Sequence, residues 1–312
     1  MHQTFRRVLC RGISCAALAA AASPAFCSAL ADGPVPAQVW PSVQGVVQLQ
    51  VGNISVAVIE DRKTVFNKAL FEGIEKDARQ LALLPGGKAP GVVKSFLVRS
   101  ESRLALIDSG YGAAFGGQTA ERLSQMGLEA GDITDIVLTH LDGDHIGGLV
   151  HEGKPVFPKA RIHLSEPEYE GWIVDGTARA QKSIDRAREI LSLYKDRIET
   201  FKFGSEVLPG VRAEDAHGHT IGHARFDIDS QGAAMTIAGD LLHAYPLQAY
   251  FPQRSSKYDQ DPDQAARMRE QTLDWLSRNG RFVSGMHVSP MGWVVKRSDG
   301  GYALMTWSPN GN

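Results

Sequence analysis

Histidine and aspartate residues gather at four places in this chain, and each group directly follows an apolar run typical of a buried strand. Residues 139–148 read Thr-His-Leu-Asp-Gly-Asp-His-Ile-Gly-Gly, and residues 217–223 read His-Gly-His-Thr-Ile-Gly-His. A Gly-Asp pair at 239–240 and a His-Val-Ser-Pro run at 287–290 complete the set. Because the loops after strand ends can aim short side chains at one point, we expect these groups to meet in space.

The imidazoles and carboxylates of these groups are the ligand types that bind Zn, Mn or Fe, and together they could hold two ions. A pair of ions lowers the pKa of a bridging water and stabilises the negative charge that develops on an oxygen. The three cysteines, Cys10, Cys15 and Cys27, all lie near the start of the chain. A metal site further along must therefore use His, Asp and Glu.

The first 31 residues are typical of a secretory signal peptide. Three arginines (Arg6, Arg7 and Arg11) precede a short apolar run at 13–22, and Ala29-Leu30-Ala31 offers a signal peptidase site. We therefore expect cleavage after residue 31, no stable membrane anchor, and a periplasmic or secreted protein. The arginine pair is compatible with either Sec or twin-arginine export. Cleavage would discard every cysteine.

Pattern and turn signals predict the elements that must position these residues. Residues 45–60 alternate around Gly52-Asn53 as a β-hairpin does. Helical spacing predicts helices over 67–84, 178–194 and 264–279. Residues 247–264 form a long polar connection of the kind that often serves as a functional lid. Strands grouped by short turns, with helices between the groups, predict one layered domain over 32–312.

Composition excludes several classes of protein. With 43% hydrophobic and 22% charged residues, the chain is neither disordered nor a coiled coil. Its formal charge is −2, and removal of the leader's three arginines leaves 30 basic against 35 acidic residues, or −5. This balance gives no basic footprint for nucleic acid.

The motifs resemble those of the metallo-β-lactamase fold superfamily, whose signature is His-x-His-x-Asp-His. Ile107-Asp108-Ser109-Gly110 is similar to the family's Asp-x-Gly turn, and residues 218–223 are similar to Gly-His-Thr-Pro-Gly-His. The leader, the early hairpin and the ending Met291-Gly292-Trp293 through Gly301-Tyr302 most resemble the methyl parathion hydrolase-like branch, which is near the quorum-quenching lactonases. The resemblance implies an α/β chain folded as an αββα sandwich.

The resemblance also implies roles for individual residues. His140 and His219 would hold a first metal, and Asp144, His145 and His287 a second, with Asp240 bridging the two. Asp144 and Asp240 would be the catalytic carboxylates, and His223 would stand next to the ligands. His217 is expected to play a similar supporting part. His151, His163 and His243 match no ligand position, although His243 is close enough to Asp240 to reach the pocket. Zinc is the expected metal, with Mn or Fe as alternatives.

One residue departs from the signature, since Asp142 stands where the family has its second histidine. It could ligate the first metal through a carboxylate, leave that site weak, or mark a degenerate relative without activity. We favour ligation, because a short carboxylate still offers an oxygen. With the usual two carboxylates, two divalent ions and a bridging hydroxide give the site a net charge of +1. With three carboxylates the net charge of the site is zero. We expect a less positive site to raise the pKa of the bridging water and to bind an anionic substrate less well. The harder oxygen ligand also shifts the metal preference from Zn towards Mn or Fe.

The expected function is hydrolysis of a lactone, ester or phosphotriester by a metal-bridged hydroxide, in an exported metallo-hydrolase. The alternatives are a degenerate metal-binding relative and a di-iron-type redox protein. Tyr111, Tyr250 and Tyr258 are candidate proton donors by residue type alone. A neutral, apolar small-molecule substrate is expected if nearby aromatic residues line the pocket, and the relatives suggest a homodimer. The aromatic candidates are Phe115, Trp172, Tyr250, Phe251 and Trp293.

Overall fold

The computed structural model describes residues 33–308, and the expected signal peptide lies outside them. Within that range the strands form an eight-stranded sheet, a seven-stranded sheet and a small hairpin of β7 (Val150–His151) and β8 (Lys154–Pro155). The first sheet has the order β1 (Val35–Pro36), β2 (Val46–Val51), β3 (Ile54–Asn67), β4 (Lys88–Ser100), β5 (Arg103–Ile107), β6 (Asp135–Val137), β9 (Arg161–Ser165) and β10 (Ile198–Phe201). The second has the order β11 (Glu206–Leu208), β12 (Val211–Asp215), β13 (Ala224–Ser230), β14 (Ala233–Ile237), β15 (Phe282–Ser284), β16 (Met291–Lys296) and β17 (Tyr302–Trp307).

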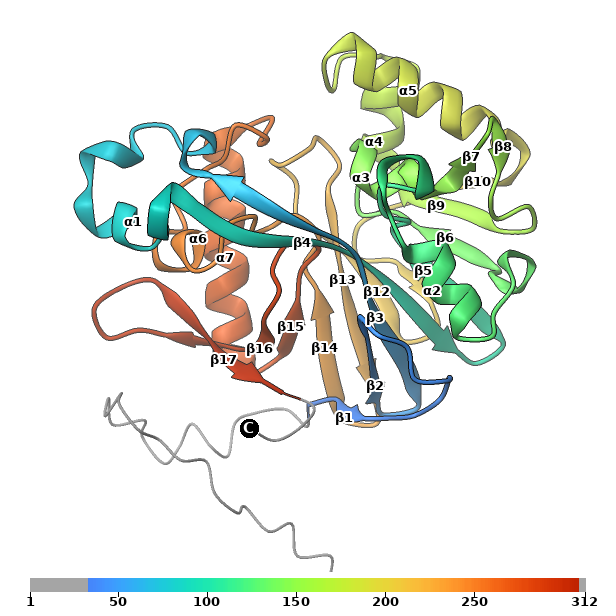
Figure 1. The fold of residues 1–312 in the computed structure, drawn as a ribbon, viewed down its shortest axis with the longest axis horizontal. Coiled ribbons are helices and arrows are strands. Elements are labelled where there is room, and N and C mark those ends of the chain that lie inside the picture. The colour runs from blue at the N-terminus through green and yellow to red at the C-terminus, as the bar shows by residue number, and fades with distance from the viewer. Residues whose placement is uncertain (1–32, 309–312) are drawn as a thin grey trace, which may run out of the picture.

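The described helices are α1 (Ala78–Ala82), α2 (Thr119–Gln125), α3 (Gly143–Ile146), α4 (Glu166–Tyr169), α5 (Gln181–Ser192), α6 (Leu247–Tyr250) and α7 (Pro262–Asn279), and a π-helical turn, Glu170–Val174, follows α4. Helices α2 and α5 lie on the side of the first sheet and α7 on the side of the second (Figure 1). Buried residues of α2 and α5 pack on the first sheet, and Leu273 and Leu276 of α7 pack on the second. The expected αββα sandwich is thus confirmed. None of the helices in the described part of the chain is both long and apolar enough to cross a membrane.

The layers of the sandwich follow from where apolar side chains stand. Phe96 and Ile107 of the first sheet meet Phe226, Met235 and Phe282 of the second in one buried cluster between the sheets. Helix α5 buries one stripe, containing Ile184, Ala187, Ile190 and Leu191, which is the spacing of an amphipathic helix. Removal of this apolar surface from water stabilises the sandwich.

The hairpin and the long C-terminal helix form where the sequence predicts them. Strands β2 and β3 pair antiparallel on either side of Gly52-Asn53. Helix α7 begins behind Asp261, whose carboxylate accepts the N–H of Gln264 at 2.9 Å, and it ends at Gly280, whose positive φ of 58° suits glycine. These local signals are strong enough to set both elements.

The prediction of a helix over 67–84 was wrong for most of that range. Strand β3 runs on to Asn67, and two 3-10 turns and the short α1 follow. Gly73 interrupts any helix there, because it adopts the left-handed conformation with φ of 70°. The apolar residues at helical spacing serve instead as a satellite cluster, in which Phe71, Ile74 and Leu84 pack on Leu247.

The connection expected as a lid is anchored to the second layer. The guanidinium of Arg269, on α7 and 1% exposed, donates to the carbonyls of Leu241, Pro252 and Arg254. It also donates to the Asp259 carboxylate at 3.1 Å. These bonds tie the segment between α6 and α7 to the body of the protein, at the edge where the histidine groups lie.

Candidate metal centre

The four histidine and aspartate groups lie together at one edge of the sandwich, in the loops that follow β6, β12, β14 and β15. The β6 loop carries His140 and leads into α3, which bears Asp144 and His145. In the first sheet β6 runs parallel to its neighbours β5 and β9, and in the second β15 runs parallel to β14, so the loops that follow these strands leave each sheet at one edge. The packing of the two sheets brings their loops together, and the rings of His145 and His287, from different sheets, lie 5.6 Å apart.

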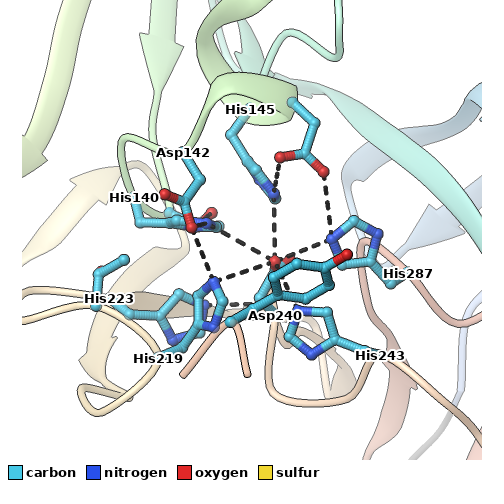
Figure 2. Close-up of polar contacts among 12 residues, drawn as sticks. His140, Asp142, His145, His219, His223, Asp240, His243 and His287 are labelled. Atoms are coloured by element: carbon cyan, nitrogen blue, oxygen red, sulfur yellow. Dashed lines mark hydrogen bonds and ion pairs between the residues drawn. The ribbon is translucent and has the colours of Figure 1, made fainter. Parts of the chain in front are cut away.

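Asp240 is the centre of this arrangement, as Figure 2 shows. Its Oδ2 atom faces the Nε2 atoms of five imidazoles among the described residues. The distances are 3.7 Å to His140, 3.4 Å to His145, 3.4 Å to His219, 3.4 Å to His243 and 2.9 Å to His287. All of these side chains are buried. A carboxylate surrounded by imidazoles is a ligand set for divalent cations.

The two other aspartates stand on opposite sides of Asp240. Asp142 Oδ2 lies 3.2 Å from His219 Nε2 and 3.5 Å from His140 Nε2. Asp144 lies 3.7 Å from His145 Nε2 and 3.5 Å from His287 Nε2. The geometry thus brings together every residue that the sequence proposed as a ligand, and it divides them into the same two groups.

Unpartnered polar atoms show that these residues fit metal ions. Nε2 of His140, of His145 and of His219 is buried without a hydrogen-bond partner, and so is Asp240 Oδ1. Buried polar atoms are rarely left in this state, because each costs about 1–3 kcal/mol. In each of the two groups the donor atoms lie within 4.8 Å of one another. Ligands of one zinc ion, each about 2.0–2.2 Å from it, are similarly close to one another.

Four of the five imidazoles are oriented through their other ring nitrogen. Nδ1 of His145 lies 2.7 Å from the Asp108 carboxylate, and Nδ1 of His219 lies 3.1 Å from that of Asp259. His140 Nδ1 lies 2.9 Å from the Thr139 hydroxyl, and His287 Nδ1 donates to the Val92 carbonyl at 3.0 Å. Such contacts fix the ring and its tautomer, and metal-binding histidines commonly have them.

His243 is the exception among the five. Its Nδ1 is buried without a hydrogen-bond partner, and its ring stacks on His287 with centroids 5.0 Å apart. It lines the cavity above Asp240, where the sequence suggested that it could reach. The two other unmatched histidines lie elsewhere, His151 exposed on β7 and His163 beside Asp135.

His223 supports the bridging position through the main chain. Its Nε2 accepts the backbone N–H of Asp240 at 2.9 Å, and its Nδ1 lies 2.8 Å from the Ala216 carbonyl. Burial and the neighbouring His219 lower the pKa of His223 to about 4, so the ring stays neutral and can accept. His217 instead pairs with Asp215 and is partly exposed.

The charges within the centre depend on one another. Burial by itself would raise the pKa of Asp240, but the imidazoles of His145 and His287 outweigh it and hold that pKa well below the usual value. Burial by itself would lower the pKa of His219, but its contacts with Asp142 and Asp259 raise it to about 9. Metal ions and protons therefore compete for these ligand atoms.

Sequence reasoning missed Glu168, which joins the two histidine-bearing loops. Its carboxylate accepts the N–H of Leu141 at 3.0 Å and, at 2.8 Å each, the Thr220 hydroxyl and the Gly222 N–H. Burial raises the pKa of Glu168 to about 7, although these bonds oppose the shift. Asp259 was missed as well. Neither carries a sequence signal, because each is a single acidic residue outside any motif.

A cavity of about 520 Å³ opens above the centre. Phe66, Tyr111 and Tyr258 line it together with the cationic residues Arg179 and Lys257. The five aromatic residues considered for the pocket lie elsewhere, so the condition for an apolar aromatic lining is not met by them. Trp172 is fully buried, Phe115 is exposed, Tyr250 and Phe251 line a separate hollow, and Trp293 packs on Phe282. Of the candidate proton donors, Tyr111 and Tyr258 face the cavity.

Solved structures with similar folds include several hydrolases. The hydrolase AbOPH of the beta lactamase superfamily is 24% identical with a TM-score of 0.77, covering 86% of this chain and 99% of that one. The dizinc quorum-quenching lactonase AidC is 24% identical with a TM-score of 0.76, covering 85% and 98%. A probable metal-dependent hydrolase from Staphylococcus aureus is 21% identical with a TM-score of 0.68, covering 83% and 100%. At these identities the likeness describes the fold alone.

Two curated relatives are probable metallo-hydrolases of Mycobacterium bovis and Mycobacterium tuberculosis. Each is 27% identical over 177 residues, which is 47% of this chain and 56% of the relative, so the match spans about half the length of either. The family model described as the metallo-beta-lactamase superfamily matches residues 89–270, more than half of the chain. This match, together with the fold and the histidine and aspartate loops, shows that the chain belongs to the metallo-beta-lactamase superfamily.

Proposed function

We propose that this chain is an exported binuclear metallo-hydrolase that cleaves a lactone, an ester or a phosphotriester. The observation that carries the proposal is the convergence of buried imidazoles on Asp240 at the floor of an open cavity. Membership of a metallo-hydrolase superfamily supports it, as do structural neighbours that include a dizinc lactonase.

Two groups of residues would each hold one metal ion. His140, Asp142 and His219 would hold one, and Asp144, His145 and His287 the other. Asp240 stands between the groups. Divalent ions bound in such a site acidify water and polarise the carbonyl or phosphoryl oxygen of a substrate. We propose zinc as the metal, as in the neighbour AidC, with Mn and Fe as the alternatives because a carboxylate oxygen also suits them.

The cavity supplies proton donors. Burial and the nearby Asp144 raise the pKa of Tyr111 to about 12, and burial raises that of Tyr258. Both phenols therefore keep their protons at neutral pH and can donate to a substrate oxygen. The neighbouring lactonases bind acyl homoserine products, which makes a lactone the first substrate to test.

The test combines metal content with turnover. Metal-reconstituted protein is offered an acyl lactone, an aryl ester, a phosphotriester and a β-lactam, and its metal per chain is measured. We expect turnover of at least one of the first three, lost on His219→Ala. His217→Ala is the matched control, because His217 lies two residues away and pairs with Asp215 outside the centre. Absence of turnover by metal-replete protein would overturn the proposal.

Export and assembly complete the proposal. We propose a periplasmic or secreted location, supported by the composition of residues 1–31, and a small-molecule substrate. N-terminal sequencing of protein recovered from the periplasm or medium is expected to begin at Asp32. Retention of the leader on protein found only in the cytoplasm would contradict this. We also propose a homodimer, on the family resemblance alone; light scattering tests it, and a monomeric mass would exclude it.

A further inference from the structure

Asp142, the residue that departs from the family signature, is held by an arginine. Arg179 Nε donates to Asp142 Oδ1 at 3.1 Å, and Arg179 Nη2 donates to Oδ2 at 2.6 Å. This two-bond arrangement is the strongest geometry for a carboxylate and a guanidinium. Among the lysines and arginines of the described chain, Arg179 alone pairs with Asp142.

Arg179 also fixes the segments around the mouth of the cavity. It lies between the π-helical turn after α4 and the start of α5, and its Nη1 donates to the Tyr258 carbonyl at 2.7 Å. Its side chain is 16% exposed. The guanidinium is therefore largely withdrawn from water, and each of its three nitrogens donates a hydrogen bond, so its charge acts on its neighbours with little screening.

The pairing leaves Asp142 able to face the centre. Oδ2 lies 3.2 Å from His219 Nε2 and 3.5 Å from His140 Nε2, and neither nitrogen has a hydrogen-bond partner. Because a carboxylate oxygen has two lone pairs, Oδ2 can accept from Arg179 and still offer a pair toward these imidazoles. Asp142 is thus oriented toward the centre rather than withdrawn from it.

We propose that Arg179 is the built-in counter-ion of Asp142, so that a carboxylate replaces the family's histidine without changing the net charge of the centre. Asp142 adds one negative charge to those of Asp144 and Asp240, and the guanidinium of Arg179 cancels it. With Arg179 counted, the centre keeps the net charge of the usual two-carboxylate set, one unit more positive than its ligands alone give. Arg179 is a positioning residue, acting on the metals through Asp142.

The inference rests on the metal centre of the proposed function, and metal affinity tests it without measuring turnover. Competition with a chromogenic chelator gives the zinc affinity of metal-free wild type, Asp142→His, Arg179→Gln and the double variant. Asp142→His leaves Arg179 unpaired beside the ions, so we expect zinc affinity to fall at least about tenfold. Adding Arg179→Gln to that variant is expected to recover most of the loss.

In the wild-type background, Arg179→Gln is expected to change the zinc affinity by less than about threefold. Removing a positive charge strengthens cation binding, and losing the orientation of Asp142 weakens it, so the two effects oppose each other. Arg179→Lys keeps the charge but loses the two-bond geometry, and its zinc affinity should likewise stay within about threefold of wild type. Arg186→Gln, on the exposed face of α5, is the matched loss of charge and should have no effect. Thermal unfolding of each metal-free variant checks the fold, and Asp142→Asn replaces Asp142→His if the latter does not fold.

The outcomes separate the two claims. If Asp142→His binds zinc as tightly as wild type, or if the double variant is no better than Asp142→His, the counter-ion role is wrong. The binuclear centre would still stand if wild type takes up two ions. If wild type takes up no metal, the proposed function fails first, and the counter-ion role fails with it.

Discussion

Glu168 offers a sharp test of how the two histidine-bearing loops are held together. Replacing it by glutamine keeps the shape but supplies one oxygen where the carboxylate has two. The amide oxygen can still accept from Thr220 and Gly222, while its NH₂ group must face the N–H of Leu141. Even when protonated at acidic pH, the Glu168 carboxyl keeps a second oxygen that can accept, which the amide lacks. A buried unsatisfied donor costs about 1–3 kcal/mol, so Glu168→Gln should be less stable than wild type by that amount at acidic pH.

The difference should shrink as the pH rises. Burial raises the pKa of Glu168 from 4.5 in the unfolded chain to about 7 in the folded one. Between these values the folded state binds more protons than the unfolded state, so wild-type stability falls with rising pH. A shift of this size corresponds to about 3 kcal/mol, which is fully present below pH 4.5 and lost by pH 7 and above. Glutamine does not titrate, so the stability of Glu168→Gln does not fall for this reason over the same pH range.

Urea unfolding of the metal-free proteins at several values between pH 5 and 8 measures this difference. We expect wild type to be more stable at pH 5 and the two stability curves to converge or cross by pH 8. Glu121→Gln, an exposed change on α2, is the control and should run parallel to wild type. A constant gap between wild type and Glu168→Gln, or one that widens with pH, would refute the reasoning.

Three further predictions concern metal binding. Asp142→Ala should lower metal content to one ion or fewer per chain by elemental analysis, and two full ions would remove its ligand role. Asp259→Asn should weaken zinc binding about 10–100-fold in a chelator competition, because Asp259 orients His219 through Nδ1; an unchanged affinity would contradict this. Removing metal with a chelator should lower the melting temperature measured by calorimetry, because ions bind the folded state preferentially. An unchanged melting temperature would contradict a resident metal.

The sequence predicts most of what local chemistry determines. The Gly52-Asn53 turn places β2 against β3, and the Asp261 cap places α7, because in each case a few adjacent residues set the backbone. The histidine and aspartate loops are likewise visible as dense runs of one ligand type. The helix predicted over 67–84 does not form, because β3 extends to Asn67 and Gly73 adopts a left-handed conformation, and both outweigh the helical spacing of the apolar residues.

The residues that sequence analysis missed share a physical cause. Glu168, Asp259 and Arg179 act through contacts with residues 27–54 positions away in the chain. Such contacts depend on tertiary packing rather than on neighbouring residues, so no spacing rule reveals them. The effect is largest at Asp142, where the sequence predicts an extra negative charge and the fold supplies Arg179 beside it.

Titration of metal into metal-free protein, followed by lactone and ester hydrolysis, tests the central claim most directly. If the buried imidazoles around Asp240 form a binuclear hydrolytic centre, activity rises with added zinc or manganese and saturates at two equivalents per chain. Hydrolysis that is equal with and without metal, or no hydrolysis of any substrate at saturating metal, would contradict the account.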